Sequence, residues 1–200
     1  SVNPVVKTAF LFPGQGSQTA GMGKEFYEVS PEARRMFEQA GKVLGLDIAE
    51  LCFNGPDDEL MLTENAQPAL LIHSTIALNM LRENGINPIL AAGHSLGEFS
   101  ALVASGALKF SDAVRLVHLR GKFMQEAVPV GKGSMAAIIG LPLHAIQELC
   151  DKVSSDSNIV QLANLNSPIQ NVIAGHKECV EKVSKDALAA GAKKTVVLPV

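Results

Sequence analysis

One serine in this chain stands in a spacing that is typical of a catalytic nucleophile. The pattern Gly-x-Ser-x-Gly, which places the serine on a sharp turn between a strand and a helix, occurs here as Gly93-His94-Ser95-Leu96-Gly97. Such a turn strains the backbone and tolerates little bulk, so the two glycines supply clearance. The apolar residues 89–92 predict the strand, and residues 98–108 predict the helix. The Ser95 hydroxyl would then project above a sheet edge, where it can attack an acyl group.

Two backbone N–H groups are expected to bind the negative charge that develops in such an attack. One belongs to Leu96, at the start of the following helix, where the helix dipole assists it. The other is expected on a loop after a different strand, and Gln15 lies on the loop 13–18 after the apolar run 8–12. This loop completes neither a dinucleotide-binding nor a P-loop pattern. A plain surface turn is the alternative interpretation.

Arg120 is the second residue with a chemical role in prospect. The predicted helix that carries it would be capped by Ser111 and Asp112, and a helical wheel places Arg120 within an apolar stripe. The stripe comprises Ala113, Leu116, Val117, Phe123, Met124 and Ala127. A guanidinium on such a face needs an anionic partner, and its planar fork suits a carboxylate. That partner is either a structural Asp or Glu or a substrate carboxylate, and the nearby serine favours the substrate.

Three amide side chains are further candidates. Gln67 is expected at the entrance of a buried helix over residues 68–81, with capping or solvation as its alternative role. His73, inside that helix, is expected to be a hydrogen-bonded core residue. Asn164 and Asn166 flank Leu165, so in an extended segment both amides face the same way. They either line a cleft between two domains or shape the turn before Ser167-Pro168.

The order of predicted elements divides the chain into two domains. Residues 1–129 are expected to form a large α/β domain. Residues 130–200 are expected to form a small domain whose last strand leads back to the large one. The small domain has the order β-α-β-β-α-β, which is the ferredoxin-like arrangement, over residues 135–139, 143–153, 159–163, 171–174, 177–190 and 194–200.

Composition excludes several classes of protein. The formal net charge is −3, tryptophan is absent and there is one tyrosine, which argues against a nucleic-acid partner. The three cysteines are widely spaced and form no Cys-x-x-Cys pattern, so neither a disulfide framework nor a metal site is expected, and a cytoplasmic setting fits. No apolar stretch reaches the length needed to span a membrane.

Five sequence blocks together resemble the bacterial malonyl-CoA:acyl-carrier-protein transacylase family, and the resemblance runs essentially end to end. The blocks are Phe12-Pro13-Gly14-Gln15-Gly16-Ser17-Gln18, Gln67-Pro68-Ala69-Leu70, Gly93-His94-Ser95-Leu96-Gly97-Glu98, Arg120-Gly121-Lys122-Phe123-Met124-Gln125 and Asn164-Leu165-Asn166-Ser167-Pro168. Related acyltransferase domains of polyketide synthases share part of this set.

The resemblance implies an α/β-hydrolase-like core that carries a ferredoxin-like subdomain, with the active site between them and no cofactor. It implies a ping-pong acyl transfer in fatty acid biosynthesis. Ser95 would accept the malonyl group of malonyl-CoA, with the Gln15 and Leu96 N–H groups as oxyanion hole and Arg120 on the malonyl carboxylate. The phosphopantetheine thiol of acyl carrier protein would then take the malonyl group. The supporting substrate-binding residues it implies are His94, Gln67, Met124, Asn164 and Asn166.

The resemblance also implies a residue outside this sequence. The family's general base is a histidine a few residues beyond the strand that matches residues 196–200, and none of the five histidines present fills that position. We therefore expect a chain that lacks the family's C-terminal part. Two alternatives stay open: a serine esterase or thioesterase on the same turn, and an inactive fragment that only binds coenzyme A or carrier protein.

A basic bias in the predicted small domain suggests a surface for an acidic carrier protein. A solvated helix face is the alternative interpretation. The lysines concerned are Lys177, Lys182, Lys185, Lys193 and Lys194.

Overall fold

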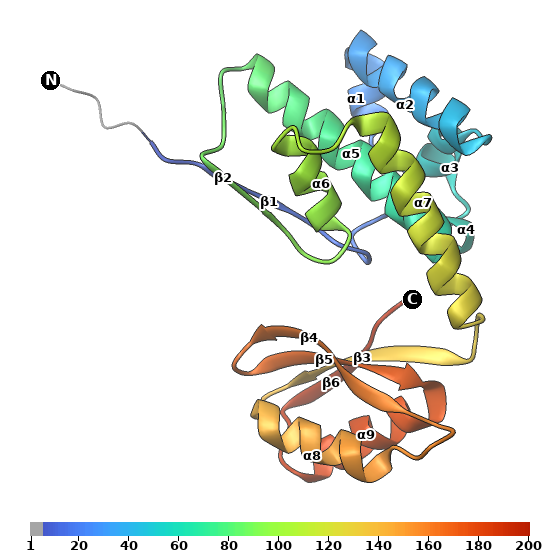
Figure 1. Ribbon diagram of the computed structural model, residues 1–200, viewed down its shortest axis with the longest axis vertical. Coiled ribbons are helices and arrows are strands. Elements are labelled where there is room, and N and C mark those ends of the chain that lie inside the picture. Colours follow the sequence, from blue (N-terminus) through green and yellow to red (C-terminus); the bar gives the residue numbers. More distant parts are fainter. Residues whose placement is uncertain (1–5) are drawn as a thin grey trace, which may run out of the picture. The chain divides into compact units, whose positions relative to one another are not determined.

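The computed structural model describes residues 6–200, which form a mixed α/β structure of two compact units (Figure 1). The first unit ends at Gln125, and the second is Glu126–Val200. The division falls within the last turn of a long helix, whereas the sequence places it after residue 129.

A parallel pair of strands organises the first unit. β1 (Ala9–Phe12) pairs with β2 (Leu90–Gly93), so that Ala9 lies opposite Leu90 and Phe12 lies opposite Gly93. The sequence predicted a buried strand over residues 8–12, but only one face is buried: Phe10 and Phe12 point inward, and Leu11 is 78% exposed. Because the strands are parallel and in register, their carboxyl ends lie side by side. The loop that carries Gln15 and the turn that carries Ser95 both leave from this edge.

Seven helices accompany these strands in residues 6–127. Five separate β1 from β2, namely α1 (Lys24–Val29), α2 (Pro31–Leu44), α3 (Ile48–Asn54), α4 (Asp57–Met61) and α5 (Thr63–Glu83), and two follow β2, namely α6 (Gly97–Ala104) and α7 (Phe110–Ala127). Local signals mark both ends of α2: the Ser30 hydroxyl accepts from the Ala33 N–H at 3.1 Å, and Gly45 ends the helix at φ 69°.

Helix α5 begins earlier than its sequence suggests. The expected start was Pro68, because proline favours the first turn of a helix, but the helix begins at Thr63. Gln67 therefore lies inside the helix and is fully buried, and its predicted place at the entrance was wrong. Pro68 has no N–H to donate to the Glu64 carbonyl one turn back. That carbonyl instead accepts a hydrogen bond from Nδ1 of His118 on α7, at 3.0 Å.

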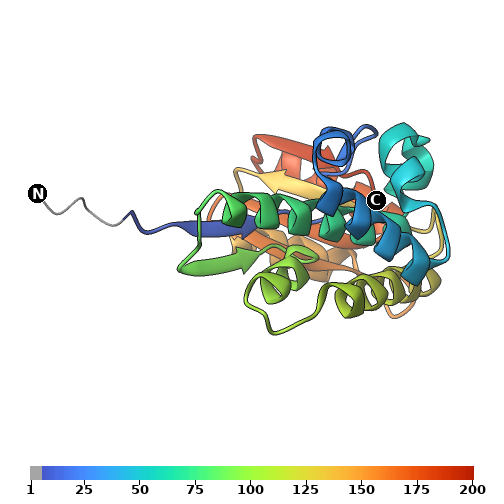
Figure 2. The same ribbon diagram turned by 90° about the horizontal axis from the view of Figure 1, so that it is seen from above.

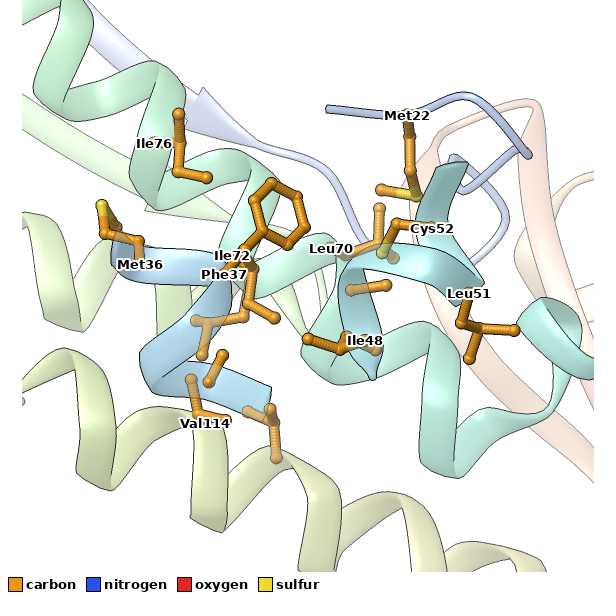
Figure 3. Close-up of a cluster of buried hydrophobic side chains, with 14 of the residues drawn as sticks. Met22, Met36, Phe37, Ile48, Leu51, Cys52, Leu70, Ile72, Ile76 and Val114 are labelled. Carbon is orange, nitrogen blue, oxygen red and sulfur yellow. The ribbon is translucent and has the colours of Figure 1, made fainter. Parts of the chain in front are cut away.

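The core of the first unit gathers around α5. Figure 2 shows α6 and α7 along one side of α5, with α2 crossing over α5 in this view. The apolar side chains that meet there come from α2, α3, α5 and α7, and Figure 3 labels Phe37, Ile48, Ile72 and Val114 among them. Helix α5 is buried on most sides, as its nearly continuous apolar sequence predicted.

The buried face of α7 differs from the predicted stripe. The residues it buries are Ala113, Val114, Val117 and Gly121. Leu116, Phe123 and Met124, which the helical wheel assigned to the stripe, are exposed, as is Ala127. Ser111 and Asp112 were expected to cap the helix but lie inside its first turn, since it begins at Phe110. Gly121 fits the buried face because a Cβ there would press on the backbone of Thr63 and Glu64.

The second unit has the predicted element order β-α-β-β-α-β. Its elements are β3 (Gly133–Ile139), α8 (Leu143–Val153), β4 (Val160–Ser167), β5 (Gln170–His176), α9 (Lys177–Ala189) and β6 (Lys194–Val197). The four strands form an antiparallel sheet in the order β4-β5-β3-β6. Both helices cover one face of this sheet (Figure 1), and Ile138, Ile146 and Val180 are among the residues of the core between them.

Strand β4 extends further than predicted, and its register is irregular. Asn164 and Asn166 lie within the strand rather than in a turn after it. The pairing with β5 shifts between Leu162 and Asn164 and again between Leu165 and Ser167. A bulge breaks the two-residue alternation, so the argument that both amides must face one way does not hold here. Asn164 is half-buried opposite Val172, whereas Asn166 is exposed.

The described residues contain three buried free cysteines. Burial raises the pKa of Cys52 to about 12 and that of Cys150 to about 11, so both thiols stay protonated and unreactive near neutral pH. Nowhere in residues 6–200 do three His, Cys, Asp or Glu side chains converge as metal ligands would. No helix in that range is long and apolar enough to cross a bilayer.

Candidate active site

Ser95 occupies the strained turn that its sequence context predicted. Its φ is 53°, and it is the one non-glycine residue with positive φ in the described part of the chain. Residues other than glycine rarely adopt this conformation, and when they do the site is often functional. The turn joins the end of β2 at Gly93 to the start of α6 at Gly97, and it leaves Ser95 exposed.

The two flanking glycines are required by close backbone approaches. A Cβ on Gly93 would collide with the backbone of Gly97, and a Cβ on Gly97 would collide with the carbonyl of Phe12 at the end of β1. The predicted reason for these glycines, clearance beside the serine, is therefore confirmed. The second contact brings the start of α6 against β1 as well as β2.

The amides after Ser95 enter the helix in sequence. The N–H groups of Gly97, Glu98 and Phe99 donate to the carbonyls of residues 94, 95 and 96 at 2.9, 3.0 and 3.0 Å. The Leu96 N–H precedes this series, at the positive end of the α6 dipole, and the Leu96 side chain is fully buried. A buried side chain holds this amide in place beside the nucleophile.

The loop after β1 packs against the serine turn. The His94 N–H donates to the Phe12 carbonyl at 3.2 Å, and a Cβ on Gly14 would meet the His94 carbonyl. Within the loop, the Gly16 N–H donates to Oε1 of Gln18 at 2.8 Å. The Gln15 side chain extends away to α5, where its Nε2 donates to Oγ1 of Thr63 at 3.1 Å.

Arg120 reaches Ser95 and Gln67 with different nitrogens. Its Nη2 donates to the Ser95 hydroxyl at 3.2 Å, and its Nη1 donates to Oε1 of Gln67 at 2.8 Å. Its Cζ lies 5.5 Å from the centre of the Phe99 ring, which is a cation–π distance. In residues 6–200 no Asp or Glu lies within ion-pair distance of Arg120, so the structural carboxylate offered as its alternative partner is not found there.

Gln67 anchors this arrangement from the core. Its Oε1 accepts from Arg120, and its Nε2 lies 3.3 Å from Sδ of Met124. A buried amide with both ends engaged is held in one orientation, since turning it over would oppose two donors. Met124 thus lies beside the hydrogen-bonded pair of Gln67 and Arg120, although the Met124 side chain is exposed.

The structure places seven of the nine predicted site residues near one edge of the first unit and two elsewhere. The seven are Ser95, Leu96, Gln15, Arg120, His94, Gln67 and Met124. Asn164 and Asn166 belong to β4 of the second unit.

Apart from His94, three histidines are engaged elsewhere and the fourth is exposed. The centres of the His73 and Phe26 rings lie 5.1 Å apart with the rings tilted by 34°, and burial lowers the pKa of His73 below the ordinary value. His118 is half-buried on α7, and its Nδ1 donates to the Glu64 carbonyl. In the second unit, Nδ1 of His176 accepts from the Ile159 N–H at 2.9 Å, and His144 is exposed on α8.

Sequence reasoning missed Phe99 and Thr63. Phe99 follows Ser95 by one helical turn, so its neighbourhood to the nucleophile could have been read from the spacing. Thr63 precedes Gln67 by the same interval, but this was hidden because the helix was expected to begin at Pro68.

Comparison with known proteins fixes the family. A family model described as the acyl transferase domain matches residues 9–198. This chain belongs to the acyl transferase domain family. The serine turn and the loop after β1 both lie within the matched range.

Individual relatives agree with this assignment. The malonyl CoA-acyl carrier protein transacylase of Bacillus subtilis is 54% identical over 194 residues, which are 97% of this chain and 61% of the relative. That of Escherichia coli K12 is 49% identical, over 96% of this chain and 62% of the relative. This acyl transferase chain therefore spans about three fifths of the length of these relatives.

Solved structures of the family superpose closely on the chain. The malonyl CoA-acyl carrier protein transacylase of Coxiella burnetii matches with a TM-score of 0.92 and 45% identity, over 97% of this chain and 61% of that one. A malonyl-transacylase solved in complex with its type II PKS acyl-carrier protein matches with a TM-score of 0.91 and 47% identity, over 98% and 63%.

Proposed function

We propose that the protein transfers a malonyl group from coenzyme A to the phosphopantetheine thiol of acyl carrier protein, through a malonyl ester on Ser95. The observation that carries this proposal is the placement of Arg120, whose fork contacts Ser95 and the Gln67 amide and faces no carboxylate in the described chain. The names of the relatives support the same substrates. The reaction would serve fatty acid biosynthesis in the cytoplasm.

We also propose a finer description of the architecture. Residues 1–129 would correspond to part of an α/β-hydrolase-like domain and residues 130–200 to a ferredoxin-like domain. The strand order β4-β5-β3-β6 with both helices on one face supports the second assignment. The parallel β1–β2 pair, with the nucleophile turn at its carboxyl edge, supports the first.

The first half of the reaction is attack by Ser95 on the thioester. The Ser95 oxygen bonds to the malonyl carbonyl carbon, the carbon–sulfur bond breaks, and coenzyme A leaves as its thiol with the proton that the serine gives up. The carbonyl oxygen carries negative charge in between, and the N–H groups of Gln15 and Leu96 would bind it.

Arg120 would select the malonyl group. In a malonyl ester a single methylene group separates the free carboxylate from the ester carbonyl. Nη2 of Arg120 is already 3.2 Å from the serine oxygen that forms the ester. A guanidinium can bind a carboxylate through two parallel hydrogen bonds. Gln67 and Phe99 hold it from the other side, which limits the entropy lost when the substrate binds.

The second half of the reaction reverses the first with another thiol. The phosphopantetheine sulfur bonds to the malonyl carbon, the ester bond breaks, and the Ser95 hydroxyl recovers a proton. His94, Met124, Asn164 and Asn166 would line the path of the acyl group or its carrier. The relative solved with its acyl-carrier protein supports such a partner.

Intact-mass measurement of the protein as its gene encodes it, before and after mixing with malonyl-CoA, tests this function. We expect one malonyl adduct that maps to Ser95 and is discharged to the thiol of acyl carrier protein. Ser95→Ala should remove the adduct. An esterase or thioesterase would instead release malonate to water, and a binding fragment would show no adduct while retaining coenzyme A or carrier protein.

A further inference from the structure

The Gln15 side chain ties the loop after β1 to helix α5. The loop 13–18 contains Gly14 and Gly16, the latter at φ 110°, and such a segment has many accessible conformations of its own. Gln15 Nε2 donates to the Thr63 hydroxyl across 48 positions of sequence at 3.1 Å. The Gln15 side chain is thereby fixed at its far end, and the loop packs against the serine turn at the neighbouring Gly14.

Thr63 itself stands on a firm support. The backbone of Thr63 and Glu64 packs against Gly121 of α7, where no Cβ would fit. The Glu64 carbonyl, which Pro68 leaves without its helical partner, is bound by His118. The first turn of α5 is therefore joined to α7, the helix that carries Arg120.

We propose that Thr63 is a positioning residue for the oxyanion hole. Its hydroxyl contacts neither Ser95 nor substrate; it holds the Gln15 side chain, so that the Gln15 N–H faces the site where the carbonyl oxygen of the acyl group becomes negative. Oxyanion donors act only within a narrow range of position. This inference rests on the proposed role of the Gln15 N–H in acyl transfer.

The position of Thr63 predicts a kinetic signature that differs from that of Arg120. The oxyanion forms on the thioester carbonyl whatever the rest of the acyl group, so loss of the Thr63 hydroxyl should slow malonyl and acetyl transfer equally. The effect should fall on kcat and leave KM for the donor unchanged, because the charge is present only in the transition state.

Three variants test this inference in the protein as encoded. Thr63→Val keeps the shape and removes the acceptor, Thr63→Ser keeps the acceptor, and Thr75→Val is the matched control, since the Thr75 hydroxyl donates to the Leu71 carbonyl within the same helix. Ser95 acylation rates are measured with malonyl-CoA, acetyl-CoA and p-nitrophenyl acetate. A lost oxyanion donor slows acyl transfer by about 10²–10³-fold, so we expect a misplaced one, in Thr63→Val, to slow all three rates by about tenfold. Thr63→Ser and Thr75→Val should acylate like the parent.

A second variant guards against misfolding of Thr63→Val. Gln15→Leu removes the same hydrogen bond from the other side and keeps the backbone N–H, so it should show the same loss, and the double variant should lose no more than either single one. Unchanged acylation in both single variants, a loss that Thr63→Ser does not rescue, or a loss confined to malonyl-CoA would each overturn the inference.

The same measurements separate this inference from the proposed function. If p-nitrophenyl acetate acylates Ser95 with the expected Thr63 dependence but malonyl-CoA does not, the malonyl assignment fails and the positioning role stands. If malonyl-CoA acylates Ser95 equally well in the parent, Thr63→Val and Gln15→Leu, only the positioning role fails. A parent that neither reagent acylates overturns both.

Discussion

Arg120 shows how a planar side chain can serve two neighbours and keep capacity for a third. Its two terminal nitrogens donate to Gln67 and Ser95, and its face lies over the Phe99 ring. A guanidinium carries five N–H donors in a fixed fork, so hydrogens remain for a substrate carboxylate. A lysine in its place would offer a point charge without this fork.

We expect Arg120→Ala to lower the rate of malonyl transfer by at least about tenfold and to affect acetyl transfer much less, because a hydrogen bond to a charged group contributes about 1.5–3 kcal/mol. The measurement is kcat/KM for the two donors with the same carrier. Arg115→Ala, on the exposed face of the same helix, is the control and should leave both values unchanged. Equal losses for both donors would mean that Arg120 has a structural role.

Burial of His73 makes the stability of the protein depend on pH. Burial lowers the pKa of His73 from the ordinary 6.5, so the native state favours the neutral ring. The unfolded chain then binds more protons than the native state between the lowered pKa and 6.5. The stabilisation that comes from the neutral His73 ring is therefore fully present above about pH 6.5 and is lost as the pH falls below that value.

We expect His73→Phe to reduce the difference in the free energy of unfolding between about pH 7.5 and pH 5.5, as measured by urea denaturation. The control is His144→Gln, an exposed histidine, which should leave the difference as it is in the parent. A difference that is the same in the parent and in His73→Phe would contradict the assignment.

At the scale of elements, the joint between α5 and α7 depends on a proline. Pro68 removes a helical donor in α5, and His118 on α7 supplies the replacement to the Glu64 carbonyl. A feature that would weaken an isolated helix thus becomes a specific contact between two helices. The contact lies beside Gly121 and fixes how the two helices meet.

We expect His118→Ala to destabilise the protein by about 1 kcal/mol, since it leaves a part-buried carbonyl without its donor. Pro68→Ala in the His118→Ala background should recover part of that loss, because alanine, unlike proline, has a backbone N–H that can reach the Glu64 carbonyl. The free energy of unfolding of the parent, both single variants and the double variant measures the coupling. Strictly additive losses would show that His118 and Pro68 act independently.

At the scale of the whole molecule, the lysines that the sequence suggested as a carrier-protein surface all belong to the second unit. Lys182 is engaged with Asp186 at 3.0 Å, which removes one lysine from the predicted basic set. Lys177, Lys185, Lys193 and Lys194 are exposed. Exposed charges of one sign chiefly raise the rate of association with a partner of opposite charge, and salt screens them.

We expect charge reversal at Lys185 and Lys193 together to raise the KM for an acidic carrier protein several-fold at low salt, because like charges then oppose the approach of the carrier. The KM for malonyl-CoA should remain as in the parent. Lys24→Glu with Lys42→Glu, both on the surface of the first unit, is the matched control for net charge. An affinity for carrier protein that is insensitive to salt and to these reversals would rule out the lysines as a docking surface.

Local chemistry carried most of the prediction for the nucleophile turn and the small unit. The Gly-x-Ser-x-Gly spacing with its strand and helix predicted a strained serine. The structure has Ser95 at φ 53° between two glycines at which a Cβ would collide with the backbone. The β-α-β-β-α-β order was also predicted, because turn residues and periodicity act within a few positions of sequence.

Contacts between segments that are distant in the sequence could not be predicted from it. The start of α5 was misplaced because Pro68 imitates a first turn, and the exposure of Phe123 was missed because a wheel gives angles but not which side meets a neighbour. The bulges of β4 depend on how β5 pairs with it. The sequence by itself determined which residues could do acyl chemistry. Only tertiary packing decided that Arg120, Gln67 and Ser95 meet, because hydrogen bonds between separate elements exist only after those elements have packed.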